Sequence, residues 1–90
     1  MKRKFNTEEA RKIGKKIGVD FDKVDIEQFR LGLAVELEHG SLWGSETNVT
    51  KDDPHFTGRI AWAHLKEIPD YYTRLAKMEA EAESPRRRVL

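Results

Sequence analysis

The segment from Asp25 to Gly40, DIEQFRLGLAVELEHG, most constrains how this chain can fold. It carries apolar residues at the three- and four-residue spacings of one helix face: Ile26, Phe29, Leu33 and Leu37. This periodicity predicts an amphipathic helix over residues 25–39. Asp25 can cap its first turn, with Gln28 three residues later completing a capping box. Gly40 can adopt the left-handed conformation that often ends a helix.

Two more apolar residues, Leu31 and Val35, lie nearly opposite that face of the same helix. A helix that is apolar on two sides is usually covered on both, by other elements of its chain or by a second subunit. The pattern therefore predicts a central helix, and it favours a homo-oligomer or a protein partner as one way of covering the second side.

Three further helices are predicted from local start and stop signals. Asn6 or Thr7 can cap a helix that ends at Gly18, and Asp53 followed by Pro54 is typical of a helix start. Pro69 separates that helix from a last one. The sequence predicts an all-α, compact four-helix domain formed by residues 1–90. Its predicted helices span residues 7–17, 25–39, 54–68 and 70–83, and its predicted frayed basic tails are residues 1–4 and 85–90.

Composition excludes several classes of protein. Charged residues make up 37% of the chain, yet the net charge is only +1, which argues against a dedicated nucleic-acid binder. The chain contains no cysteine, so it can form no disulfide framework. No apolar run approaches the roughly 20 residues of a membrane span, and no signal-peptide pattern is present. We therefore expect a cytoplasmic protein that does not insert into a membrane.

The pairs Glu36-x-x-His39 and His64-x-x-Glu67 are the strongest candidates for a functional site. A separation of three residues places both members of a pair on one helix face. Bundle proteins that hold two metal ions use such pairs on neighbouring helices. Glu36 and His64 also lie next to apolar helix faces, where an ionised group costs several kcal/mol unless it is paired or ligated.

Two interpretations of these four residues remain open. A structural hydrogen-bonded pair of Glu36 and His64 is favoured, and the alternative is a site for a divalent transition metal formed by Glu36, His39, His64 and Glu67. If the two helices formed an antiparallel hairpin, His64 would lie about 15 Å from the helix start, far from His39. The four residues would then form two half-sites that only a dimer interface could unite.

Other side chains support weaker interpretations. Asp52, Asp53 and His55 could approach His39 and Glu38 as mixed oxygen and nitrogen ligands. The simpler interpretation is that Asp53 caps its helix while Asp52 and His55 face solvent. For Tyr71 and Tyr72, we expect one ring in the core and one at the rim with its hydroxyl on water.

Several strings of this chain resemble a family of short bacterial and phage domains of unknown function. The strings are FNTEEARKIG, ELEHG, TNVTKDDP and TGRIAWAHLKEIPDYYTRL, so the resemblance extends from Phe5 to about Glu83. Family members occur alone or joined to phage-associated proteins, which implies a phage association here. His55 departs from the family pattern, where an aliphatic residue is typical, and this weakens the site around Asp52. The resemblance implies no activity.

We therefore expect a non-enzymatic interaction or oligomerisation module, because no complete catalytic set is present. The alternative is a metal-binding protein or small metalloenzyme that uses Glu36, His39, His64 and Glu67. Nucleic-acid binding through the basic termini is the weakest hypothesis.

Overall fold

The computed structural model describes residues 4–40 and 44–82, and within these ranges it contains four α-helices and no strand. The helices are α1 (Thr7–Ile17), α2 (Ile26–Glu36), α3 (Pro54–Glu67) and α4 (Tyr71–Ala82), with short 3-10 turns η1 (Leu37–His39) and η3 (Ser45–Thr47). The predicted all-α fold is confirmed, with closely matching helix bounds. The predicted tails lie, apart from Lys4, outside the described residues. None of the helices in the described ranges is long and apolar enough to cross a membrane.

Local capping explains why α1 and α3 begin and end where they do. Asn6 and Glu9 form a reciprocal capping box at the start of α1. Gly18 ends α1 with a left-handed φ of 97°. Asp53 accepts hydrogen bonds from the first backbone N–H groups of α3, and Pro54 occupies its first position. The predicted caps at Asn6, Gly18 and Asp53 are confirmed, and the reciprocal bond from Glu9 adds to the first of them.

Gln28 does not complete the capping box predicted at the start of α2. Asp25 does cap that helix, accepting from the backbone N–H groups of Glu27 and Gln28. The Gln28 side chain instead accepts from the Tyr72 backbone N–H at 3.1 Å and donates to the Thr73 hydroxyl at 2.6 Å. Gln28 therefore caps the N-terminus of α4 from the neighbouring helix. It accepts a hydrogen bond from a first-turn backbone N–H that has no partner within α4.

Gly40 is not the left-handed helix cap that the sequence suggested, because its φ is −93°. The helical path ends earlier, in the 3-10 turn η1. The glycine is needed for space, because a Cβ at this position would collide with the Asp52 side chain. The backbone N–H groups of Val49 and Thr50 both donate to the His39 carbonyl, which ties the loop before α3 back to the end of α2.

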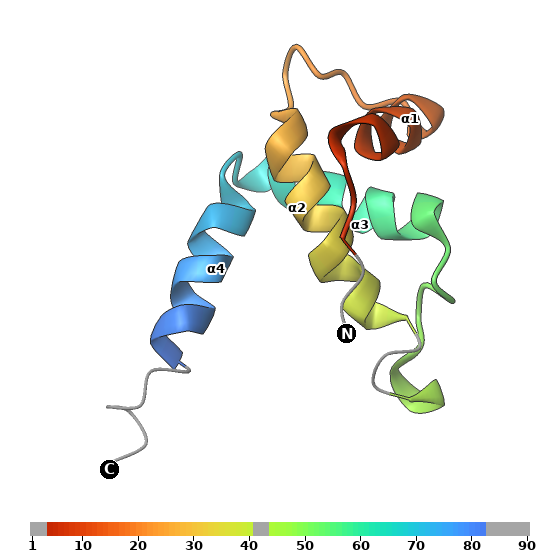
Figure 1. Cartoon of the computed structure of the whole chain (residues 1–90), viewed down its shortest axis with the longest axis vertical. Coiled ribbons are helices and arrows are strands. Elements are labelled where there is room, and N and C mark those ends of the chain that lie inside the picture. The colour runs from red at the N-terminus through yellow and green to blue at the C-terminus, as the bar shows by residue number, and fades with distance from the viewer. Residues whose placement is uncertain (1–3, 41–43, 83–90) are drawn as a thin grey trace.

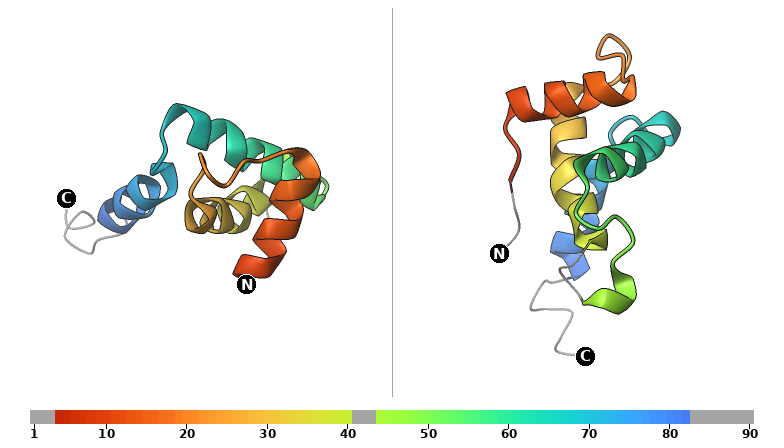
Figure 2. Two further views of the ribbon diagram at one scale, coloured as in Figure 1. Left: turned by 90° about the horizontal axis from the view of Figure 1, so that it is seen from above. Right: turned by 90° about the vertical axis from the view of Figure 1, so that its right-hand side faces the viewer.

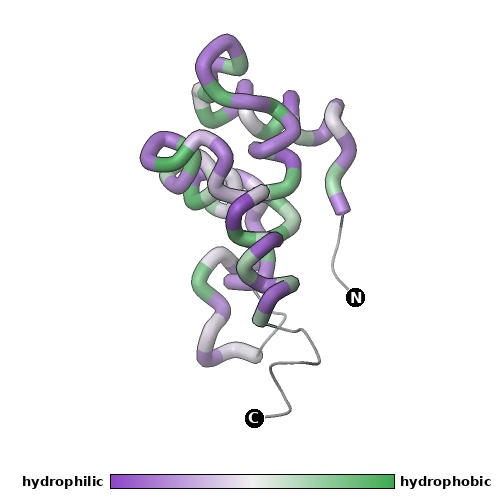
Figure 3. The backbone as a smooth tube through the Cα atoms, turned by 90° about the vertical axis from the view of Figure 1, so that its left-hand side faces the viewer, coloured by the Kyte–Doolittle hydropathy of each residue, from purple (hydrophilic) through white to green (hydrophobic). Residues whose placement is uncertain are grey.

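The second helix, α2, lies at the centre of the molecule, as predicted. Figure 1 shows α1 beside the first turns of α2, α3 crossing behind α2, and α4 on the side of α2 away from α1. The view from above in Figure 2 confirms that α4 lies to one side of the other helices. Hydrophobic and hydrophilic residues are interspersed along the backbone (Figure 3), and the buried apolar side chains form one cluster. Its members are Phe5, Ala10, Val19, Phe29, Leu33, Ala61, Leu65 and Tyr72.

Candidate functional site

The last residue of α2, Glu36, carries a buried carboxylate that is only 2% exposed. Its Oε2 atom accepts a hydrogen bond of 2.7 Å from the Tyr72 hydroxyl, which comes from the first turn of α4. Tyr72 is equally buried, at 2% exposed. A charge-assisted hydrogen bond in a water-excluded setting is stronger than the same bond in water. This contact therefore joins α4 to the core.

Gly32 makes room for that hydrogen bond one turn before Glu36. A Cβ at Gly32 would lie 2.9 Å from the Ala61 Cβ on α3 and 2.8 Å from a ring carbon of Tyr72. Cβ atoms essentially never approach so closely, so only glycine lets α2 meet α3 and the Tyr72 ring at the same point.

Two imidazoles flank the Glu36 carboxylate, one on each oxygen. The Nε2 atom of His64 lies 3.5 Å from Oε2, and the Nε2 atom of His39 lies 3.2 Å from Oε1. The His64 ring stacks on the Tyr71 ring, with a centroid separation of 4.3 Å and an interplanar angle of 4°. Tyr72 packs edge-on against both of these rings. The four side chains thus form a continuous aromatic and polar cluster around Glu36.

One oxygen of Glu36 is poorly satisfied. Oε1 is buried and has no hydrogen-bond partner in the described part of the chain, because His39 lies at 3.2 Å without hydrogen-bond alignment. The two histidine side chains are more open, at 58% exposed for His39 and 36% for His64. Removing a carboxylate from water costs several kcal/mol unless its oxygens are paired. The site can therefore gain from a cation or an added donor at Oε1.

The pKa of the Tyr72 phenol is raised well above its ordinary value. Burial is the main cause, because it disfavours the charged phenolate. The hydrogen bond to Glu36 and the negative charge of that carboxylate raise the pKa further. The hydroxyl therefore remains a proton donor to Glu36 at every pH where an ordinary tyrosine is neutral.

The expected separation of His39 from His64 is wrong. It assumed an antiparallel hairpin, whereas α3 crosses behind α2 with Gly32 and Ala61 in close approach (Figure 1). Glu36 follows Gly32 by four residues and His64 follows Ala61 by three, so both side chains lie just beyond the crossing point. Glu36 and His64 do lie close together, but the predicted hydrogen bond between them is not present in the described residues, because Tyr72 bonds to the Glu36 oxygen that faces His64. His39 joins the same cluster on the other oxygen.

The other predicted ligands lie apart from this cluster. Glu67 is exposed on α3, and it forms no ion pair within the described residues. Asp53 caps α3, while His55 is exposed with its Nδ1 atom 4.0 Å from the Asp53 carboxylate. In residues 4–40 and 44–82, no group of three or more histidine, cysteine or acidic side chains is arranged to hold a metal ion as it stands.

Tyr72 is the site residue whose role the sequence did not predict. The expectation of one core ring and one rim ring is correct, because Tyr72 is buried and Tyr71 is half-buried. The hydroxyl of Tyr72, the core ring, bonds to Glu36, a partner that the sequence analysis did not assign. The sequence did contain a signal for this contact. Glu36 and Tyr72 both lie on apolar helix faces, and each polar group needs a partner when it is buried.

The model of the family DUF5661, described as a protein of unknown function, matches residues 10–81 of the chain. A search of curated proteins and a search of solved structures each returned no match. The matched range contains all of α2, α3 and the cluster around Glu36. The chain belongs to the DUF5661 family of proteins of unknown function.

Proposed function

We propose that this protein is a non-enzymatic interaction module that forms a homodimer through α4. The supporting observation is an apolar stripe on α4 that is covered only at its start. Its members lie at spacings of four, three and four residues: Tyr71, Leu75, Met78 and Ala82. Met78 is 56% exposed, and every described residue after Leu75 is exposed. Such spacing is that of a coiled-coil seam.

Charges along α4 favour a second copy in the antiparallel orientation. Arg74 and Lys77 precede Met78, whereas Glu79 and Glu81 follow it. Arg74 also pairs with Asp70 at 2.7 Å within its own chain, and the side chains of both residues are largely exposed. When two copies of α4 run in opposite directions, the basic half of each faces the acidic half of the other. A parallel pair would place like charges together, which is unfavourable.

The start of α4 is fixed firmly enough to present this stripe. Gln28 caps its first turn, and the Tyr72 hydroxyl bonds to Glu36. A helix of 12 residues is only about 18 Å long, so the dimer interface is small. We therefore expect a dimer that dissociates on dilution.

Replacing Met78 by Glu should weaken this dimer by at least about tenfold in dissociation constant, because it places a charge in the seam. Light scattering over a concentration series measures the effect. Ala80→Glu is the matched control, since Ala80 lies on the opposite face of the same helix and should leave association unchanged. A parent protein that is monomeric at every concentration contradicts the proposal.

Charge reversal tests the antiparallel orientation separately. Arg74→Glu should weaken the dimer, and adding Glu81→Arg should restore it, because both exchanged charges then face each other across the two-fold axis. Failure of the double variant to recover would exclude the pairing of these two positions while leaving association through Met78 intact.

Metal binding is a second candidate function, favoured by the buried Oε1 atom of Glu36. A divalent transition metal could bind this oxygen if the imidazoles of His39 and His64 turned toward it, and carboxylate with imidazole suits such metals. Glu67, one turn beyond His64, is the candidate fourth ligand. Because the ligands do not converge as they stand, binding would require side-chain rotation.

Zinc or nickel should raise the melting temperature if this candidate is correct, because a ligand that binds only the folded state stabilises it. At a metal concentration of 100 times the dissociation constant, the gain is about 2.7 kcal/mol. His64→Ala should abolish the gain, whereas His55→Ala, outside the cluster, should keep it. An equal response of both variants would exclude the cluster as the metal site.

The cytoplasmic location stays a prediction from composition, and the phage association stays a prediction from the family resemblance.

A further inference from the structure

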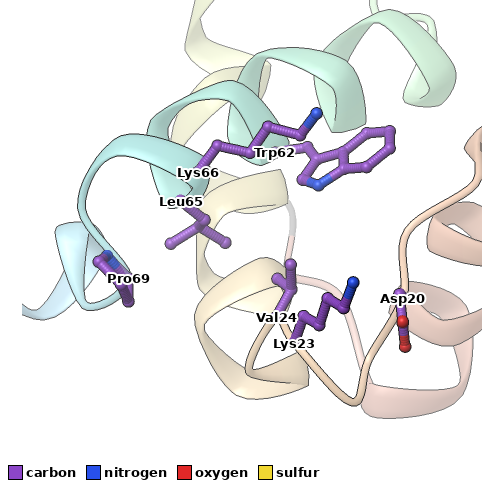
Figure 4. A pocket seen from close by; sticks show the side chains of 7 residues that line it. All are labelled: Asp20, Lys23, Val24, Trp62, Leu65, Lys66 and Pro69. Atoms are coloured by element: carbon purple, nitrogen blue, oxygen red, sulfur yellow. The ribbon is translucent and has the colours of Figure 1, made fainter.

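A pocket separate from Glu36 lies between the loop that joins α1 to α2 and the last turns of α3. Its volume is about 430 Å³, within the range of roughly 300–1,000 Å³ that is typical of small-molecule sites. Figure 4 shows the seven side chains that line it, from both segments. They are Asp20, Lys23, Val24, Trp62, Leu65, Lys66 and Pro69.

The pocket has an apolar end and a basic end. Leu65 and Pro69 form the apolar end, and Val24 borders that end from the loop (Figure 4). Trp62, half-buried, lies toward the other end. The Lys23 side chain lies on the loop side of this end, the Lys66 side chain runs along the Trp62 ring on the α3 side, and Asp20 lines the same end from the loop. A ligand that fits both ends needs an apolar body and a charged or polar head.

The two lysines determine which charge the head group of the ligand must carry. The Lys66 ammonium lies 4.4 Å from the centroid of the Trp62 ring, which holds it beside the pocket by a cation–π contact. Within the described ranges, neither Lys23 nor Lys66 forms an ion pair with a carboxylate. Asp20 also lines the pocket, with its Oδ1 atom accepting a hydrogen bond from the Asp22 backbone N–H. The lining therefore carries two positive charges and one negative charge, and its net charge still favours an anionic head.

The helix end also limits where an anion can bind. The backbone carbonyls at the C-terminus of α3 carry partial negative charge, which disfavours an anion near Pro69. The anionic group therefore belongs at the lysine end, and the apolar body belongs against Leu65 and Val24.

We propose that this pocket binds a small carboxylate with an aromatic body, whose acid group lies between Lys23 and Lys66 and whose ring packs on Val24, Leu65 and Pro69. This inference is independent of the α4 dimer and of the Glu36 cluster, because none of their residues lines the pocket. Trp62 provides a built-in reporter, since its indole borders the site.

The probe is 3-phenylpropanoate, compared with the neutral 3-phenylpropanamide of nearly the same shape. Trp43→Phe leaves Trp62 as the single tryptophan, whose indole N–H resonance can be followed by NMR during each titration. We expect saturable shifts, with the carboxylate binding about fivefold more tightly than the amide because of two partly exposed charge pairs.

Lys23→Met/Lys66→Met removes both charges while keeping the apolar stems, and it should make the two ligands bind equally. Lys12→Met/Lys16→Met, on exposed α1 positions, is the matched control and should keep the preference. Three results would each overturn the proposal. The parent could bind acid and amide equally, the pocket variant could keep the preference for the acid, or the Trp62 resonance could fail to shift. Tight binding of an acidic peptide without binding of the carboxylate would also overturn it.

Discussion

Tyr72→Ala is expected to destabilise the protein by about 3–5 kcal/mol, the usual loss for deleting a buried aromatic ring. The ring fills the space above Gly32, and its hydroxyl supplies the 2.7 Å hydrogen bond to Glu36. For a domain of this size, each kcal/mol corresponds to about 4–8 °C in melting temperature. Thermal unfolding at fixed protein concentration measures the loss.

Tyr72→Phe isolates the hydroxyl from the ring. It should cost about 1–3 kcal/mol, because the buried Glu36 carboxylate loses a donor and keeps its desolvation penalty. Tyr71→Phe is the matched control on the adjacent residue, and it should change stability by less than about 0.5 kcal/mol since its half-buried ring is kept. If Tyr72→Phe is as stable as the parent, the hydrogen bond to Glu36 contributes nothing.

The boundaries of α1 and α3 could be predicted because their signals are local. The capping box of Asn6 with Glu9 and the cap of Asp53 before Pro54 lie within three residues of the helix they start. The burial of Glu36 near His64 could also be predicted, because both lie beside apolar faces of their helices. Periodicity of side chains determines which faces are buried.

The remaining features depend on contacts between distant segments. Gln28 could serve its own helix or another, and its two hydrogen bonds to α4 span 44 and 45 residues of sequence. Glycine is a common residue at the end of a helix, but Gly40 is needed for another reason. A Cβ at this position would collide with the side chain of Asp52. The crossing of α2 and α3, which brings His39 and His64 to one carboxylate, depends on the packing at Gly32. None of these follows from spacing along one helix.

Stability should fall more steeply at alkaline pH in the parent than in Tyr72→Phe. The folded state raises the pKa of Tyr72 above the unfolded value of about 10. The neutral phenol therefore contributes its full stabilisation below that pH. Above it, the unfolded chain releases a proton that the folded chain retains, so the contribution falls by about 1.4 kcal/mol per pH unit until the folded phenol ionises.

Denaturant unfolding of both proteins between about pH 8 and pH 11 measures this effect. Lysines titrate in the same range, but they are common to the two proteins, so the difference between the two unfolding free energies reports Tyr72. A difference that stays constant across this range contradicts the raised pKa.

Spectroscopic titration of the Tyr71→Phe variant tests the buried Tyr72–Glu36 pair most directly, because Tyr72 is then the only tyrosine in the chain. If the phenol is buried and donates to Glu36, tyrosinate absorbance should appear only when the fold is lost, together with the change in helical circular dichroism. Ionisation near pH 10 with the helices intact would show that Tyr72 is hydrated and that Glu36 does not hold α4 in place.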